Sequence, residues 1–188
     1  MPSRADYTLV LRRRRARVLI AGGGKVAAQK LKGLPLDWDV KVVAPRALAS
    51  LKKRATWIRR KVRLSDVDAA DIIFAATDDA QANQKVAARA VKKGKLVCVA
   101  DAPELGNFIV PAVLKVGRFR ATLSTGGASP ALAKALRRWL EQRLSSPRLR
   151  ALAADLERQR AKMKKDPQLK ARLLKGLDDP GFMERILR

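Results

Sequence analysis

The stretch VLIAGGGKVAAQKLKGL, residues 18–34, decides the fold because an apolar run leads directly into three consecutive glycines and then into a helical pattern. The run before Gly22 is typical of a buried strand that ends at a glycine. Apolar residues then recur with the spacing of one helix face, at Val26, Ala27, Leu31 and Leu34. The stretch therefore predicts a strand, a tight glycine turn and a helix.

The same alternation continues through the first half of the chain. Further short apolar runs end at turn residues within 39–45, 70–79 and 95–101, and a helical pattern covers 80–94. Strands that alternate with helices are typical of a parallel sheet with crossover connections. The fold class is therefore α/β.

The pattern changes in the last third of the chain. GRFRATLSTGG, residues 117–127, precedes a strong helical pattern over 129–144, and the chain from Ser145 onward is charged and helix-prone. We expect a small helical region to follow the α/β domain.

Composition limits the possible classes of protein. Hydrophobic residues make up 47% of the 188 residues, which is enough for a core, and no apolar run reaches the roughly 18 residues of a membrane span. Residues 1–15 place their charges after a short apolar patch, which is the wrong order for a secretory signal. The lone Cys98 excludes an internal disulfide and agrees with a reducing compartment. We therefore expect a cytoplasmic protein.

The net charge is strongly positive, because 42 Lys and Arg oppose 17 Asp and Glu to give +25. Such a surface attracts nucleic acid, anionic lipid or a multiply carboxylated substrate, and its sign does not choose among them. Aromatic residues are only 4% of the chain, which disfavours a stacking platform for single strands. Basic residues gather in four separate segments, 12–17, 52–63, 137–143 and 158–165.

The glycine turn carries the first functional pattern. Gly22-x-Gly24-x-x-Ala27 follows an expected strand and opens an expected helix, which is the context of a dinucleotide-binding turn. Gly22 would permit the tight turn, Gly24 would let a pyrophosphate approach the backbone, and Ala27 would allow close helix packing. The alternative is a glycine-rich turn that binds nothing.

The second expected strand lacks the acidic residue that usually binds the ribose hydroxyls about 20 positions after the glycines. It ends in Ala44, Pro45 and Arg46 instead. Arg46 could meet a 2′-phosphate, so the residues alone leave the choice between NAD and NADP open.

Polar residues follow the next two expected strands. Asp101 stands where ligands bind in such sheets and could act as a general base, or it could belong to an ordinary turn. Thr77 and Asp78 could touch a cofactor or cap the following helix, and capping is favoured for Asp79. Ser124, Thr125, Gly126 and Gly127 form either an anion-binding turn or a plain turn before the helix that starts at Ser129-Pro130.

Four separated segments together resemble the precorrin-2 dehydrogenase module of the siroheme synthase family. They are GGGKVAAQK, AATDDAQANQKV, VADAPELGNFIVPAV and LSTGGASPALAKALR, in the order and spacing of that family. The resemblance implies a Rossmann-type NAD-binding domain over 1–113, a dimerisation segment over 114–145 and a helical region over 146–188. It also implies an oxidoreductase of siroheme biosynthesis, a homodimer that oxidises the tetrapyrrole precorrin-2 to sirohydrochlorin with NAD.

The resemblance assigns roles to individual residues. Asp101 matches the catalytic position, and the family uses NAD without the usual acidic residue. The implied cofactor contacts are Gly22, Gly24, Lys25, Val26, Pro45, Arg46 and Thr77. The implied substrate contacts are Asn83, Ser124, Thr125, Gly126 and Gly127.

Two further questions concern metal and nucleic acid. Some members of the family also insert iron, but this chain contains no histidine, so chelation would rest on carboxylates such as Asp101, and no metal site is predicted. The alternative to the enzyme is a Rossmann-like basic module that binds nucleic acid or a protein partner without turnover. The enzyme hypothesis predicts only weak, non-specific binding to nucleic acid, and neither hypothesis includes a membrane.

Overall fold

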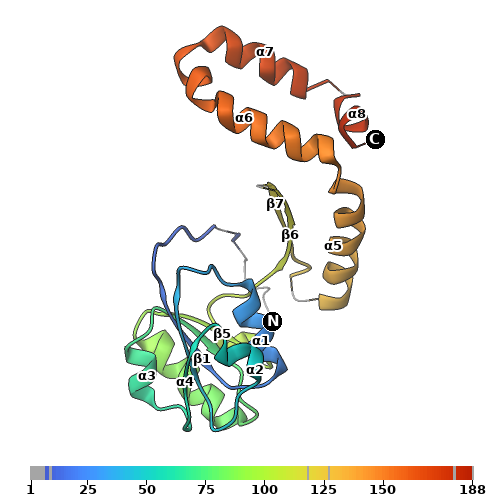
Figure 1. Cartoon of the computed structure of the whole chain (residues 1–188). Coiled ribbons are helices and arrows are strands. Elements are labelled where there is room, and N and C mark those ends of the chain that lie inside the picture. The colour runs from blue at the N-terminus through green and yellow to red at the C-terminus, as the bar shows by residue number, and fades with distance from the viewer. Residues whose placement is uncertain (1–6, 9, 118, 127, 180, 188) are drawn as a thin grey trace. The chain divides into compact units, whose positions relative to one another are not determined.

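The computed structural model describes residues 7, 8, 10–117, 119–126, 128–179 and 181–187, which fold as two compact units, Met1–Val110 and Pro111–Arg188 (Figure 1). The first unit contains one sheet of five parallel strands in the order β3-β2-β1-β4-β5. The strands are β1 (Arg17–Ala21), β2 (Asp39–Val43), β3 (Thr56–Ile58), β4 (Ile72–Ala75) and β5 (Leu96–Val99). The predicted α/β class is confirmed.

Helices cover both faces of this sheet, which explains why the central strands read as continuous apolar runs. Alternate residues of β1 point to opposite faces: Val18 and Ile20 lie in one core cluster and Leu19 in the other. The first cluster includes residues of α1 (Lys25–Gly33) and α2 (Ala49–Lys52). The second includes residues of α3 (Leu64–Asp68) and α4 (Ala80–Lys92).

The segment between β2 and β4 was not predicted as regular structure. It forms α2, β3 and α3, whereas the sequence there shows mainly a run of basic residues. The three-residue β3 is too short for a periodic signal, and it is fixed by tertiary contacts instead. Trp57 donates a hydrogen bond from its indole nitrogen Nε1 to the Ala44 carbonyl at 3.0 Å, and the Ala44 N–H donates to the Ile58 carbonyl at 3.2 Å.

The second unit begins with an antiparallel hairpin, β6 (Ala112–Val116) and β7 (Phe119–Leu123), against which α5 (Pro130–Leu144) packs. Helices α6 (Pro147–Lys165), α7 (Pro167–Leu177) and α8 (Phe182–Leu187) follow. The hairpin was not predicted, whereas the helix over 129–144 and the helical region after Ser145 are confirmed. A short 3₁₀ turn, η1 (Pro103–Leu105), lies in the first unit after β5.

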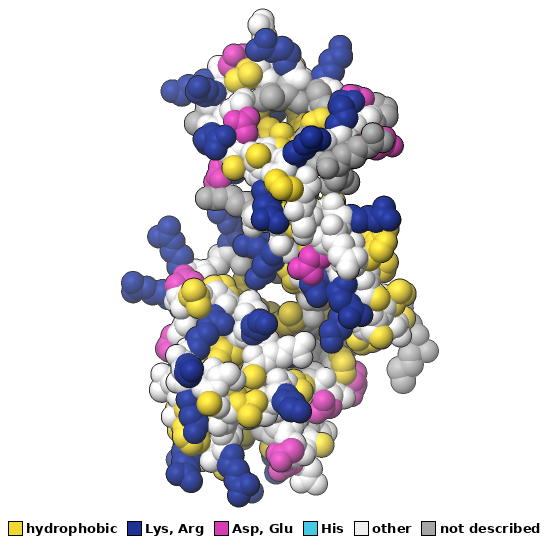
Figure 2. Space-filling view, turned by 45° about the vertical axis from the view of Figure 1, so that its right-hand side comes forward, with side chains coloured by type: hydrophobic (Ala, Val, Ile, Leu, Met, Phe, Trp, Pro, Cys, Tyr) yellow, Lys and Arg dark blue, Asp and Glu magenta, His cyan; other side chains and the backbone are white. Residues whose placement is uncertain are grey.

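Basic side chains are distributed rather than gathered. On the face seen in Figure 2, Lys and Arg appear over both units. This distribution of Lys and Arg gives no single stripe on this face that would match a nucleic-acid backbone.

Within the described part of the chain, no helix combines the length and the apolar character that a membrane crossing requires.

An ion-pair network joins the starts of β1 and β4. Asp71 accepts hydrogen bonds from the Arg17 backbone N–H at 3.0 Å and from the Arg17 guanidinium at 2.8 and 3.2 Å. Arg13 approaches the same carboxylate at 3.1 Å. These hydrogen bonds, chiefly those from the Arg17 side chain, hold the pKa of Asp71 well below its usual range.

We expect Asp71→Asn to lower the free energy of unfolding at pH 7 by about 1–2 kcal/mol, because it removes the charge of this ion pair. The loss is no larger because the Arg17 side chain is more than half exposed, so solvent screens the pair. The lowered folded-state pKa means that the stabilisation is complete above the unfolded pKa of about 4 and is lost as the pH falls below it. Urea unfolding at pH 7 and pH 3 should show a smaller difference from wild type at pH 3. Asp37→Asn, at an exposed carboxylate, is the control. An equal difference at both pH values would contradict the ion-pair explanation.

Candidate functional site

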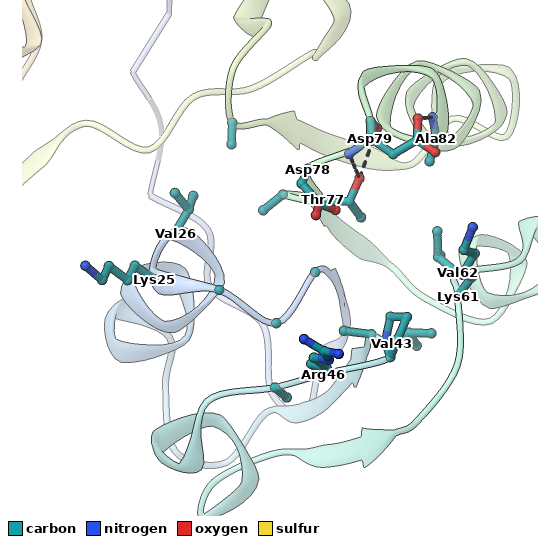
Figure 3. A pocket seen from close by; sticks show the side chains of 18 of the residues that line it. Lys25, Val26, Val43, Arg46, Lys61, Val62, Thr77, Asp78, Asp79 and Ala82 are labelled. Atoms are coloured by element: carbon teal, nitrogen blue, oxygen red, sulfur yellow. Dashed lines mark hydrogen bonds between the residues drawn. The ribbon is translucent and has the colours of Figure 1, made fainter.

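A cleft of about 1080 Å³ opens at the carboxyl ends of the parallel strands in the first unit (Figure 3). Ligands bind at this edge in doubly wound sheets, where the strand order reverses between β1 and β4. The structure brings together here all seven residues expected to contact the cofactor, together with the expected catalytic residue Asp101. The residues that line the cleft include Gly22, Gly24, Lys25, Val26, Pro45, Arg46, Thr77 and Asp101.

Gly22 forms the tight turn after β1. Its φ of +124° favours glycine, and its N–H donates to the Val43 carbonyl at 3.0 Å. A Cβ at this position would lie 2.1 Å from the Ala76 carbonyl oxygen. The turn is therefore held between the ends of β2 and β4, and only glycine fits there.

Gly23, the unassigned residue of the expected pattern, also has a packing role. A Cβ there would lie 1.9 Å from the Arg46 carbonyl oxygen, and the Gly23 carbonyl accepts a hydrogen bond from the Leu48 N–H at 3.0 Å. The glycine loop thus packs directly on the segment that follows β2. Three consecutive glycines are the sequence signal that could have indicated this second close contact.

Gly24 differs from its two neighbours. It precedes α1 with φ of −88°, a conformation open to any residue, and a Cβ there would meet nothing within 4 Å. Neither backbone conformation nor packing within the chain therefore requires glycine. An open cradle before a helix N-terminus fits a pyrophosphate, which approaches the backbone closely and accepts from free N–H groups.

The loop after β4 is organised by one buried side chain. Asn83 is only 4% exposed, and its Oδ1 accepts from the Thr77 hydroxyl at 2.7 Å and the Thr77 N–H at 3.1 Å. Its Nδ2 donates to the Thr77 carbonyl at 3.0 Å. Asn83 therefore positions Thr77 at the cleft, a role that sequence reasoning missed, and its contact with substrate stays a prediction.

Asp79 and Asp101 have different surroundings. Asp79 accepts a hydrogen bond from the Ala82 N–H at 3.0 Å, which confirms that it caps α4. Asp101 is exposed, two residues after the end of β5, and lines both the main cleft and an adjoining cavity of about 370 Å³. A free carboxylate at that position could accept a proton from a bound substrate.

The loop expected to contact substrate before α5 belongs to the second unit. Ser124 Oγ accepts from the Gly126 N–H at 3.2 Å, and Thr125 Oγ1 accepts from the Ser129 N–H at 3.0 Å. Gly126 has φ of +60°, and Gly127 lies outside the described residues. The two hydroxyls organise the turn into α5, and their contact with substrate stays a prediction.

Cys98 is buried in β5, and burial raises the pKa of its thiol despite the Lys30 ammonium 3.8 Å from Sγ. It is therefore a protonated core side chain. Among the described residues, no three His, Cys, Asp or Glu side chains gather in a way that could hold a metal ion.

Comparison with known proteins assigns the first unit to a family. Residues 9–112 match the family described as "Putative NAD(P)-binding". The siroheme synthase of Gluconacetobacter diazotrophicus is 37% identical over 165 residues, which cover 82% of this chain and 35% of that protein. The siroheme synthase of Methylococcus capsulatus is 40% identical over 161 residues, covering 80% of this chain and 34% of that protein. The chain spans about a third of the length of these relatives.

Two further relatives match over most of their own length. The precorrin-2 dehydrogenase of Bacillus subtilis is 36% identical over 126 residues, which cover 64% of this chain and 77% of that protein. A solved structure named SirC, precorrin-2 dehydrogenase, is 28% identical with a TM-score of 0.78, and the match covers 95% of this chain and 92% of that one. These matches confirm the resemblance identified in the sequence. With a glycine-loop cleft and a relative matched over three quarters of its length, the chain belongs to the precorrin-2 dehydrogenase family.

Proposed function

We propose that this chain is an oxidoreductase that uses NAD to oxidise precorrin-2 to sirohydrochlorin. The observation that carries the proposal is the cleft itself, in which the open cradle at Gly24 and the exposed carboxylate of Asp101 line one cavity. The names of the relatives supply the substrate. Because those relatives are named as enzymes of siroheme synthesis, the alternative of a nucleic-acid-binding module is not favoured.

The residues that line the cleft would hold the successive parts of the cofactor, from the adenosine through the pyrophosphate to the nicotinamide. Gly22, Gly24 and the first N–H groups of α1, at Lys25 and Val26, would hold the pyrophosphate. Pro45 and Arg46 would lie beside the adenosine, and Thr77 would lie toward the nicotinamide. NAD bound there supplies the acceptor for a hydride.

Oxidation of precorrin-2 removes a hydride and a proton, so a base is needed beside the hydride acceptor. Asp101 provides a carboxylate that can take the proton. The Asn83–Thr77 hydrogen bonds keep the neighbouring loop in place. The positive charge of the chain favours the approach of a polycarboxylated tetrapyrrole.

The test is an anaerobic assay of the full chain with precorrin-2 and NAD⁺, following the absorbance of sirohydrochlorin. We expect turnover that depends on the nucleotide. Absence of turnover with both NAD⁺ and NADP⁺ would contradict the proposal. Strong, salt-sensitive DNA binding without turnover would instead favour the basic-module alternative.

The proposed enzyme is a cytoplasmic homodimer. Leu132, Leu136 and Trp139 are 51%, 41% and 50% exposed at i, i+4 and i+7 of α5, so they form one apolar face. Burial of this apolar face against a second copy of the chain would be favourable. We expect sedimentation to give a dimer mass for the wild type and a monomer mass for Leu136→Lys, with Lys134→Gln, an exposed neighbour, unchanged. A monomeric wild type would contradict the dimer.

A further inference from the structure

We propose that Asn107 is a positioning residue for the oxidation, because it fixes the loop that places the carboxylate of Asp101 in the cleft. We refer to residues 100–107 as the Asp101 loop. The inference rests on the proposed function in one respect, that Asp101 takes the proton from the substrate. It adds a residue that lines neither cavity but on which the role of Asp101 depends.

Asn107 occupies the free edge of β5, the last strand of the sheet order. Its Oδ1 accepts a hydrogen bond from the Val97 N–H at 2.8 Å, and its Nδ2 donates to the Lys95 carbonyl at 2.8 Å. The Asn107 backbone N–H donates to the Val97 carbonyl at 3.0 Å. One residue thus satisfies three backbone groups that a further strand would otherwise pair.

The chain passes from one face of the sheet to the other at Asn107. Leu105 packs against the core cluster that includes residues of α3 and α4. Phe108 packs against the opposite cluster and meets the Phe74 ring edge-on, with the ring centroids 5.7 Å apart. These apolar contacts decide which face each side chain covers, whereas the directional hydrogen bonds of Asn107 fix where the backbone lies along β5. Asn107 itself is exposed, so core packing does not explain its contacts.

The Asp101 loop is therefore held to the sheet at both ends. At its start, the Ala100 N–H donates to the Ala75 carbonyl at 2.9 Å, which extends the pairing of β4 with β5. At its end, Asn107 binds the free edge of β5. The short turn η1 lies between these two points, so loss of the hydrogen bonds at Asn107 would release the loop on one side.

The carboxylate of Asp101 has no support of its own. Within the parts of the chain that the structure describes, no hydrogen bond or ion pair holds it. Its place in the cleft is thus set by the backbone of the Asp101 loop. Because a displacement of about 1 Å in a reacting group can cost about 100-fold in rate, the hydrogen bonds of Asn107 bear directly on turnover.

The test is a double-variant cycle in the anaerobic assay, with the full chain and saturating NAD⁺. We expect Asn107→Ala to lower kcat by about 10- to 50-fold, while the KM for precorrin-2 and the calorimetric NAD⁺ affinity stay within about threefold of wild type. In the Asp101→Asn background, the same substitution should lower kcat by less than about twofold. The two effects do not add, because the group that Asn107 positions no longer takes the proton.

Asp71→Asn is the matched control. It breaks the ion pair at the starts of β1 and β4, the opposite end of the sheet from the Asp101 loop, so it lowers stability without moving that loop. Its kcat should stay within about twofold of wild type, and urea unfolding measures the loss of stability in each variant. Asn107→Ser can replace at most one of the two side-chain hydrogen bonds, so it should lose less turnover than Asn107→Ala. It gives the same comparison if the alanine variant does not fold.

The outcomes separate the inference from the proposed function. Equal losses from Asn107→Ala in the wild-type and Asp101→Asn backgrounds would overturn the positioning role and leave the proposed function standing. Unchanged kcat in a folded Asn107→Ala, or an equal loss in Asp71→Asn, would do the same. Absence of wild-type turnover with both NAD⁺ and NADP⁺ would overturn the inference and the proposed function together.

Discussion

Alanine in place of Gly24 is expected to weaken NAD⁺ binding by about 10- to 100-fold, because its methyl group would occupy the space where the pyrophosphate meets the backbone. The fold should tolerate the change. A Cβ at Gly24 meets nothing within 4 Å, and φ is −88°, so the loss in the free energy of unfolding should not exceed about 1 kcal/mol, the difference between glycine and alanine at a helix N-cap. Calorimetric titration and urea unfolding measure the two effects separately.

Two other glycines give this prediction its controls. Gly33→Ala also meets no neighbour within 4 Å, but it lies at the other end of α1, so both NAD⁺ affinity and stability should be retained. Gly22→Ala should cost several kcal/mol, because its Cβ would lie 2.1 Å from the Ala76 oxygen at a φ of +124°. Unchanged NAD⁺ affinity in a stable Gly24→Ala variant would contradict the pyrophosphate assignment.

The core of the first unit could be predicted from the sequence because its pattern is local. A parallel strand buried on both faces reads as an apolar run, and a crossover helix has a regular apolar face. Residues 18–34 contain both in succession, and the structure places β1, Gly22 and α1 there. The capping role of Asp79 is equally local, since the cap and the N–H it accepts from are three residues apart.

The missed features depend on contacts between distant segments. Strand β3 has three residues and is held through Trp57 and the end of β2, so no periodicity reveals it. The need for glycine at Gly23 arises from Arg46, a residue in another turn. Asn83 matched a family position expected near substrate, but its packing beneath Thr77 appears only once α4 is placed on the sheet.

Asp101→Asn is expected to lower the rate of precorrin-2 oxidation by about 10²- to 10⁴-fold, the usual contribution of a general base. The amide has the size of the carboxylate but cannot take the proton that leaves with oxidation. Because Asp101 is exposed and lies after β5, the substitution should leave the free energy of unfolding close to that of wild type. The NAD⁺ affinity should stay within about threefold of wild type. The measurements are the anaerobic assay with saturating NAD⁺ and calorimetric titration of the nucleotide.

Asp78→Asn distinguishes a base from a mere negative charge. Asp78 lines both cavities with Asp101, but it comes from the end of β4 rather than β5. If Asp101 takes the proton, Asp78→Asn should lower turnover by less than about fivefold, since only a screened charge is lost. Equal losses in the two variants would assign both carboxylates an electrostatic role. Full turnover in Asp101→Asn would move the base to another group of the cleft and leave the Gly24 cradle as the feature that supports the dehydrogenase.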